Sequence, residues 1–195
     1  MNLPNVITLS RIPCMFVIVG LMYCTWPGAA SLAFWLFMAA AVGDWVDGYV
    51  ARRRGIVSTF GKLMDALTDK IMVMGLVIAF VDLHRLPVLL ALITLCREFL
   101  ITGLRMVVAA KGVVVPADGG GKSKTLTQLI ALGFLLGAPM ARRDWALFLP
   151  WNMDSFADHA GMVGVGIFVL GTFLAVWSGW RYIARYQSLI FSPSD

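Results

Sequence analysis

Four aspartates stand within otherwise apolar segments of this 195-residue chain: Asp44, Asp47, Asp65 and Asp69. On helices, the i, i+3 spacing of the first pair and the i, i+4 spacing of the second place each pair on one helix face. An antiparallel pair of helices would bring both faces to a similar depth, as a cage of four carboxylates. Like charges this close repel unless cations neutralise them. Because oxygen-only ligands favour a hard divalent ion, the pattern predicts a site for two Mg²⁺ or Mn²⁺ ions.

The plainer explanation for these acids is a set of ordinary salt bridges at helix ends. The basic residues available for such pairs are Arg52, Arg53, Lys62 and Lys70. A charged side chain near the bilayer centre costs ~2.5–3.5 kcal/mol on insertion scales, so carboxylates in apolar segments need a partner or a function. We favour the metal site because two pairs of acids are grouped so tightly. Gly48 and Gly61 would let a ligand approach the backbone, although either could instead serve helix packing.

The composition indicates that the elements carrying these residues are membrane helices. Hydrophobic residues make up 59% of the chain and charged residues 14%, against roughly 25% charged in an ordinary soluble domain. This excludes a disordered chain and argues against a soluble domain. The net charge of +5 would suit nucleic acid, but the basic residues are scattered through short loops, so we expect no nucleic-acid partner.

Uncharged stretches predict six transmembrane helices in one domain, residues 1–195. The longest stretch, 12–43, is broken by the turn signal Trp26-Pro27-Gly28 and exceeds one crossing of ~20 residues, so it predicts a helical hairpin. Further apolar segments cover residues 60–81, 86–110, 125–140 and 159–180. The two long hydrophilic connections would then be residues 111–124 and 138–158.

Basic residues fall unequally on the two sides of these spans. One side holds only Arg85, Arg142 and Arg143. The other side holds Arg11, Arg52, Arg53, Arg54, Lys62, Lys111, Lys122, Lys124, Arg181 and Arg185. Since cytoplasmic loops carry the excess of Lys and Arg, both termini should be cytoplasmic. We therefore expect an all-α integral membrane protein with its carboxylate metal site at the cytoplasmic side.

A run across the second and third spans resembles the signature of the CDP-alcohol phosphotransferase family. It reads Asp44-Trp-Val-Asp47-Gly48-Tyr-Val-Ala51-Arg52, eight residues, Gly61-Lys-Leu-Met-Asp65-Ala-Leu-Thr-Asp69. All eight defining positions match in identity and spacing. The resemblance implies six transmembrane helices, a two-metal site and transfer of a phosphatidyl or similar group from a CDP-linked donor to an alcohol, with release of CMP.

The resemblance also implies a role for each position of this run. The metal ligands would be Asp44, Asp47, Asp65 and Asp69. The CDP-binding positions would be Asp44, Asp47, Gly48, Ala51, Arg52, Gly61 and Asp65. Asp69, one helical turn beyond Asp65, is the best candidate for the general base of the reaction, even if it also touches the second metal.

Similarity to one bacterial branch of the family, the phosphatidylglycerophosphate synthases, extends over nearly the full chain. It rests on Asn2-Leu-Pro-Asn5-Val-Ile-Thr8-Leu-Ser-Arg11, on Arg97-Glu98-Phe99 with Thr102-Gly103-Leu104-Arg105, and on Gly121-Lys122-Ser-Lys124-Thr125. Two departures are Ala66, where that branch often carries Pro, and the stretch 138–158. The similarity implies CDP-diacylglycerol as donor, sn-glycerol 3-phosphate as acceptor, and a place in the bacterial inner membrane with the active site facing the cytoplasm.

Arg97 and Arg105 are eight residues apart and share a face of the fourth span, flanked by Glu98 and Thr102. Near the carboxylates, their fork-shaped donors suit a second anion, the phosphate of glycerol 3-phosphate. Lys122 and Lys124 either complete this pocket or only follow the positive-inside rule, and the similarity adds Thr8 to it. The alternative for Arg97 is an ion pair with Glu98 that ties helices together.

Two other functions stay open at this point. A cardiolipin synthase of the same fold would use phosphatidylglycerol as acceptor, and the acceptor's identity rests on resemblance alone. A cation transporter would need polar groups at several depths, whereas the halves of the spans farthest from the carboxylates hold almost no charge. The expected partners are CDP-diacylglycerol, sn-glycerol 3-phosphate and membrane lipid. The sequence does not give the oligomeric state, so a homodimer also stays open.

Overall fold

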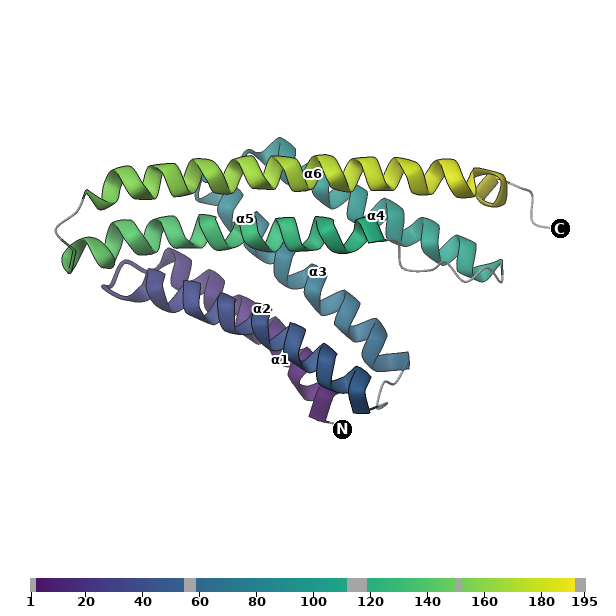
Figure 1. Ribbon diagram of the computed structural model, residues 1–195, viewed down its shortest axis with the longest axis horizontal. Coiled ribbons are helices and arrows are strands. Elements are labelled where there is room, and N and C mark those ends of the chain that lie inside the picture. The colour runs from purple at the N-terminus through teal and green to yellow at the C-terminus, as the bar shows by residue number, and fades with distance from the viewer. Residues whose placement is uncertain (1–2, 55–58, 112–118, 150–151, 192–195) are drawn as a thin grey trace.

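The computed structural model in Figure 1 describes residues 3–54, 59–111, 119–149 and 152–191, with side chains for 10–43, 64, 67–111, 125–149 and 152–187. These ranges fold into helices and contain no strand. In chain order they are α1 (Leu3–Tyr23), α2 (Ala29–Arg54), α3 (Thr59–Asp82), α4 (Val88–Ala110), α5 (Gly119–Arg143), the 3₁₀ helix η1 (Trp145–Leu147) and α6 (Met153–Phe191). The expected all-α class is confirmed.

The predicted hairpin between α1 and α2 is present. Its turn contains Gly28, whose φ of +94° lies in the left-handed region that glycine adopts at no steric cost. The third and fourth predicted segments differ from α3 and α4 by at most two residues at either end. The apolar runs and the Trp-Pro-Gly turn are local signals, and they located these elements well.

The predicted bounds of both long hydrophilic connections were wrong, and residues 112–118 of the first lie outside the described residues. Residues 138–158 are mostly helical, because α5 continues to Arg143 and α6 begins at Met153. Residues 119–124 likewise belong to α5. Charged residues end an apolar run without ending a helix, since Arg and Lys have good helix propensity. Arg142 of α5 also pairs with Asp154 and Asp158 of α6, which holds the two extended helix ends together.

Two pairs of helices run parallel to each other. In the α1–α3 pair, Met15 lies against Gly75, and the hydroxyl of Tyr23 donates to Asp82 at 2.7 Å. In the α4–α6 pair, the hydroxyl of Thr94 lies 3.1 Å from the hydroxyl of Thr172, and Arg97, three residues later, contacts Ala175, also three residues later. Figure 1 shows α5 and α6 side by side along the long axis of the molecule, with α4 close to α6.

The helix α5 is antiparallel to both α2 and α6. The contacts that show this are Phe34 with Gly137, Phe37 with Gly133, Leu135 with Gly164 and Gln128 with Gly171. Together with the two parallel pairs, these contacts mean that successive helices alternate in direction. Alternation brings the end of α2, the start of α3, the end of α4 and the start of α5 to one end of the bundle, called here the aspartate end. The α1–α2 turn, the α3–α4 loop and η1 lie at the opposite end.

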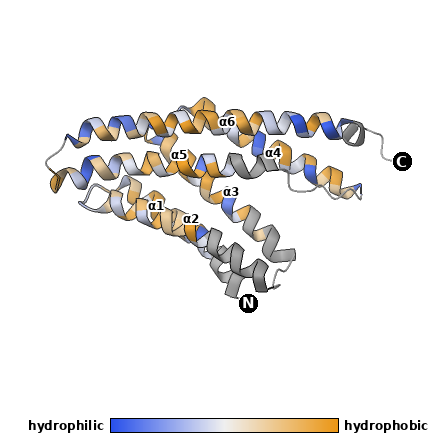
Figure 2. Ribbon diagram, in the orientation of Figure 1, coloured by the Kyte–Doolittle hydropathy of each residue, from blue (hydrophilic) through white to orange (hydrophobic). Residues whose placement is uncertain are grey.

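The interior is apolar and so is much of the surface. Ile18, Phe37, Leu76, Leu132 and Phe168 are fully buried in one core cluster. Many large apolar side chains are nevertheless exposed, and Figure 2 shows long hydrophobic stretches on α4 and α6. Among the described residues, Thr125–Leu147 and Met153–Gln187 are long and apolar enough to cross a membrane, and 10–23 and 29–43 form shorter apolar helices. This architecture is consistent with a membrane protein.

Candidate functional site

The four aspartates lie on helices as their spacing predicted. Asp44 and Asp47 belong to α2, and Asp65 and Asp69 belong to α3, so each pair shares a helix face. The side chains of Asp44, Asp47 and Asp65 lie outside the described residues, whereas Asp69 is partly buried. Among the side chains that are described, no three His, Cys, Asp or Glu gather into a group that could hold a metal. Because that set leaves out three of the four carboxylates, the metal site stays a prediction.

Several other predicted positions also lie outside the described side chains. They are Thr8, Gly48, Ala51, Arg52, Gly61, Lys122 and Lys124. Their backbone is helical, in α1, α2, α3 and α5. Alternation of the helices brings all of these positions toward the aspartate end. Their assignment to CDP or to glycerol phosphate therefore stays a prediction. The fold brings all of these positions to the same end of the bundle.

The described part of the site is a polar cluster where α3 and α4 approach each other. Lys70 of α3 donates from Nζ to the hydroxyl of Thr102 at 2.6 Å, and this ammonium lies 4.0 Å from Glu98. The hydroxyl of Thr102 in turn donates to the backbone carbonyl of Glu98 at 2.7 Å. Lys70 directly follows Asp69, so these contacts bring α3 next to α4 one residue after the candidate base.

Arg97 ties α4 to α6. Its Nε donates to the backbone carbonyl of Ala175 at 2.8 Å, and one terminal nitrogen donates to the hydroxyl of Ser178 at 2.7 Å. The other terminal nitrogen lies 2.8 Å from Glu98, and the Arg97 side chain is only 13% exposed. The ion pair that the sequence offered as the alternative for Arg97 is thus present. A guanidinium has five N–H donors, so two remain beyond these three contacts.

Arg105, eight residues further along α4, has a different environment. Its guanidinium lies 5.7 Å from the centroid of the Tyr182 ring, a cation–π geometry. The side chain is exposed, and the described residues give it no carboxylate partner. The two arginines share a face of α4, as their spacing predicted, and the structure shows that this face meets α6. Of the two, Arg105 has more donors available to an anion.

The sequence analysis missed the α6 side of this cluster. Ser178 and Tyr182 contact the two arginines, and Gly179 lies against α4, since a Cβ there would be in van der Waals contact, 3.4 Å from Ile101 and 3.5 Å from the Arg97 Nε. The available signal was a stripe of small and polar residues at helical spacing on an apolar helix: Thr172, Ala175, Ser178, Gly179 and Tyr182.

Comparison with known proteins shows the family of this chain. Residues 1–152 match the family described as CDP-alcohol phosphatidyltransferase. A protein of Bacillus subtilis (strain 168) named CDP-diacylglycerol--glycerol-3-phosphate 3-phosphatidyltransferase is 38% identical, and the match covers 94% of each chain. Proteins with the same name from Rickettsia bellii (strain RML369-C) and Escherichia coli (strain K12) are 34% and 32% identical over 93% and 96% of each chain. This chain belongs to the CDP-alcohol phosphatidyltransferase family.

Proposed function

We propose that this chain transfers the phosphatidyl group of CDP-diacylglycerol to sn-glycerol 3-phosphate, which releases CMP and forms phosphatidylglycerol phosphate. The observation that carries the proposal is similarity over 94% of both chains to a bacterial protein named for this activity. The helical placement of the signature on α2 and α3 supports it.

The donor set on α2 and α3 fits Mg²⁺ or Mn²⁺. The run 44–69 offers four carboxylates and contains neither His nor Cys, so it supplies the oxygen ligands that hard cations take. We assign Asp44, Asp47, Asp65 and Asp69 as ligands of two ions. When bound, these ions would neutralise charge on the donor pyrophosphate.

The remaining signature positions bind the CDP portion of the donor. Gly48, Ala51 and Gly61 have small side chains or none, which lets the nucleotide lie against the backbone of α2 and α3. Arg52 offers charge-assisted hydrogen bonds to a phosphate. The nucleotide is thereby fixed at the aspartate end, while both acyl chains stay in the lipid beside the helices.

The chemical step joins the acceptor to the donor phosphorus. A hydroxyl oxygen of glycerol 3-phosphate attacks the phosphorus that bears diacylglycerol, and the bond from this phosphorus to the oxygen of CMP breaks. Asp69 accepts the hydroxyl proton as general base. Its neighbour Lys70 is hydrogen-bonded to Thr102 of α4, so the base lies beside the helix that carries Arg105.

Arg105 is the principal group that binds the acceptor phosphate. Its support is exposure and the lack of a carboxylate partner among the described residues. Arg97 contributes its two remaining N–H donors from a fixed position, and Lys122, Lys124 and Thr8 complete the pocket from α5 and α1. Guanidinium groups match phosphate oxygens in a two-point geometry.

We further propose that the chain is one multi-pass domain, residues 1–195, in the bacterial inner membrane, with six spans and its active site facing the cytoplasm. The alternating direction of successive helices supports six crossings. The excess of Lys and Arg toward the aspartate end supports a cytoplasmic site. A site at this interface receives a lipid donor from the bilayer and a soluble acceptor from water.

An acceptor screen with the purified full-length protein tests the proposal. CMP release is measured with CDP-diacylglycerol and Mg²⁺ in the presence of sn-glycerol 3-phosphate, phosphatidylglycerol or no acceptor. Release with glycerol 3-phosphate and formation of phosphatidylglycerol phosphate are expected. Preferential use of phosphatidylglycerol would make the chain a cardiolipin synthase. Cation flux into vesicles without any CMP release would assign it to the transporters instead.

A further inference from the structure

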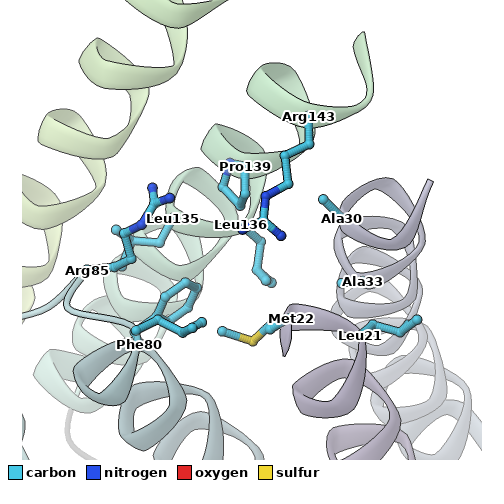
Figure 3. Close-up of a pocket in the computed structure, with 11 residues that line it drawn as sticks. Leu21, Met22, Ala30, Ala33, Phe80, Arg85, Leu135, Leu136, Pro139 and Arg143 are labelled. Carbon is cyan, nitrogen blue, oxygen red and sulfur yellow. The ribbon is translucent and has the colours of Figure 1, made fainter. Parts of the chain in front are cut away.

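A cavity of about 120 Å³ lies at the end of the bundle opposite the aspartates, between the α1–α2 hairpin, α3 and α5 (Figure 3). Its walls are mostly apolar and include Leu21, Met22, Ala33, Phe80, Leu135 and Leu136. Apolar cavities of about 150 Å³ hold a molecule the size of benzene, whereas one water in the liquid takes about 30 Å³. The cavity therefore has room for a short stretch of hydrocarbon.

Two arginines also line this cavity, and Figure 3 shows them on either side of Pro139. Arg85 comes from the α3–α4 loop, and Arg143 ends α5. Arg143 donates to the backbone carbonyl of Cys24 at 3.3 Å. Neither arginine has an ion-pair partner within the described residues. Burial lowers the pKa of Arg85, and the nearby charges of Arg142 and Arg143 lower it further, which reflects the excess of positive charge here.

The nearby carboxylates are already engaged elsewhere. Asp154 and Asp158 pair with Arg142, which does not line the cavity. The two oxygens of Asp144 accept backbone N–H groups of α2 and its preceding turn. Asp158 still attracts Arg85 through space, and Asp144 attracts Arg143, but no ion pair forms between them. Apart from the contact of Arg143 with Cys24, the described residues therefore leave the donors of both arginines to an anion from outside the chain.

Exposed aromatic side chains surround the same end of the bundle. Trp26 is 50% exposed in the α1–α2 turn, Trp145 is 40% exposed in η1, and Phe148 is 83% exposed just after it. Exposed Trp side chains of membrane proteins concentrate at the level of the lipid headgroups. In a bilayer, the cavity arginines would lie at the depth of the lipid phosphates.

We propose that this cavity is a binding site for an anionic phospholipid, with the phosphate diester on Arg85 and Arg143 and adjoining hydrocarbon against the apolar wall. Guanidinium forks suit the phosphate oxygens, which accounts for the charge. We assign a lipid and not free phosphate because of the apolar wall. Free phosphate would leave the space beside that wall empty, whereas the hydrocarbon of a lipid would fill it. The site is separate from the aspartate end, and its existence does not depend on the reaction proposed above.

Photo-crosslinking in nanodiscs tests this site. Full-length protein is placed in phosphatidylcholine nanodiscs that contain a minor amount of phosphatidylglycerol with a diazirine on its acyl chain near the glycerol. Labelled peptides are mapped by mass spectrometry. We expect label on the segments that contain Leu21 and Leu136. The Arg85→Gln/Arg143→Gln variant should lose at least about tenfold of this label, because it removes both charge-assisted contacts. Label in these segments that is unchanged by the double substitution would refute the site.

Three further arms complete the test. Arg142→Gln is the matched control and should keep the wild-type labelling. Phosphatidylcholine with the same diazirine should label these segments of the wild-type protein weakly. This comparison uses only the wild-type protein, so it tests the site even if the double variant does not fold. Equal labelling by both lipids overturns the proposal, as does complete loss of label in excess inorganic phosphate, which would assign a free-anion site. CMP release by each variant, expected at the wild-type level, reports intact folding.

Discussion

The carboxylate of Asp144, at the end of α5, accepts the backbone N–H of Ser31 in the first turn of α2 at 2.6 Å. Its other oxygen accepts the N–H of Gly28 at 2.9 Å, and the residue is only 5% exposed. The first N–H groups of a helix have no partner within that helix. Asp144 therefore caps α2 from a position far along the chain, and α2 is the helix that carries Asp44 and Asp47.

Replacing Asp144 with Ala should lower stability, because it removes the cap and leaves two partly buried N–H groups without this acceptor. We expect a loss of about 1–3 kcal/mol in the free energy of unfolding. Thermal unfolding in detergent, followed by circular dichroism, measures it. The control is Asp154→Ala, which removes a 77% exposed carboxylate from a surface ion pair and should change stability less. Equal shifts for the two variants would argue against the cap.

Arg105→Ala should raise the KM for glycerol 3-phosphate by about 10- to 100-fold, the value of a lost hydrogen bond to a charged group. The KM for CDP-diacylglycerol should stay almost unchanged, because only the acceptor loses a contact. Steady-state CMP release at varied concentrations of each substrate gives both constants.

Arg181→Ala provides the matched control for Arg105, since it removes an exposed arginine next to Tyr182 on α6. It should leave both KM values near those of the wild type. If Arg105→Ala raises the KM values for both substrates to the same degree, the assignment of Arg105 to the acceptor fails.

Asp69→Asn and Asp44→Asn should separate chemistry from donor binding. Asp69→Asn keeps the side-chain shape but removes the base, so turnover should fall by ~10²–10⁴-fold while donor binding survives. Asp44→Asn removes a proposed metal ligand, so Mg²⁺-dependent donor binding and turnover should fall together. The measurements are CDP-diacylglycerol binding over a range of Mg²⁺ concentrations and single-turnover CMP release. Full rescue of Asp69→Asn by high Mg²⁺ would show that Asp69 acts as a metal ligand only, and its assignment as the base would fail.

Gly164→Leu should destabilise the contact between α5 and α6. A Cβ at Gly164 would lie 3.0 Å from Leu135 and 3.1 Å from Phe134, so a larger side chain must push the helices apart. Overpacking of this kind costs about 1–3 kcal/mol. Gly166→Leu is the control on the same helix, because a Cβ there meets nothing within 4 Å. A similar melting temperature for both variants would contradict the close packing.

Cysteine labelling should place the two ends of the bundle on opposite sides of the membrane. With Cys14, Cys24 and Cys96 replaced, Phe148→Cys should react with an impermeant thiol reagent added from outside the inner membrane. Lys111→Cys, at the aspartate end, should react only after the membrane is opened. Labelling of Lys111→Cys from outside would place the proposed active site on the wrong face.

The sequence predicted the elements better than their ends. Hydropathy and the turn at Gly28 are local signals, so six helices and the hairpin could be recognised. The ends of α5 and α6 could not be predicted in this way. Hydropathy indicates where an apolar, lipid-facing segment ends, whereas a helix ends where its backbone hydrogen bonds end. Arg142, in the last turn of α5, pairs with Asp154 and Asp158 of α6, and such contacts depend on tertiary structure.

In the candidate site too, local sequence signals predicted some features, while others depend on tertiary contacts. Helical spacing was enough to place Arg97 and Arg105 on one face of α4. It could not tell that Arg97 is held by Ala175 and Ser178 while Arg105 is not, because that difference arises from α6, far away in the sequence. The two roles suggested for Arg97 are compatible, since its ion pair leaves two N–H donors unused.

The parallel pairing of α4 and α6 has a consequence for related sequences. Thr94 meets Thr172, Arg97 meets Ala175 and Ile101 meets Gly179, each pair at the same separation of 78 residues. Substitutions at such facing positions should therefore co-vary. A relative with a residue larger than Ala in place of Gly179 should carry a smaller one in place of Ile101, because a Cβ at position 179 would already contact Ile101 at 3.4 Å.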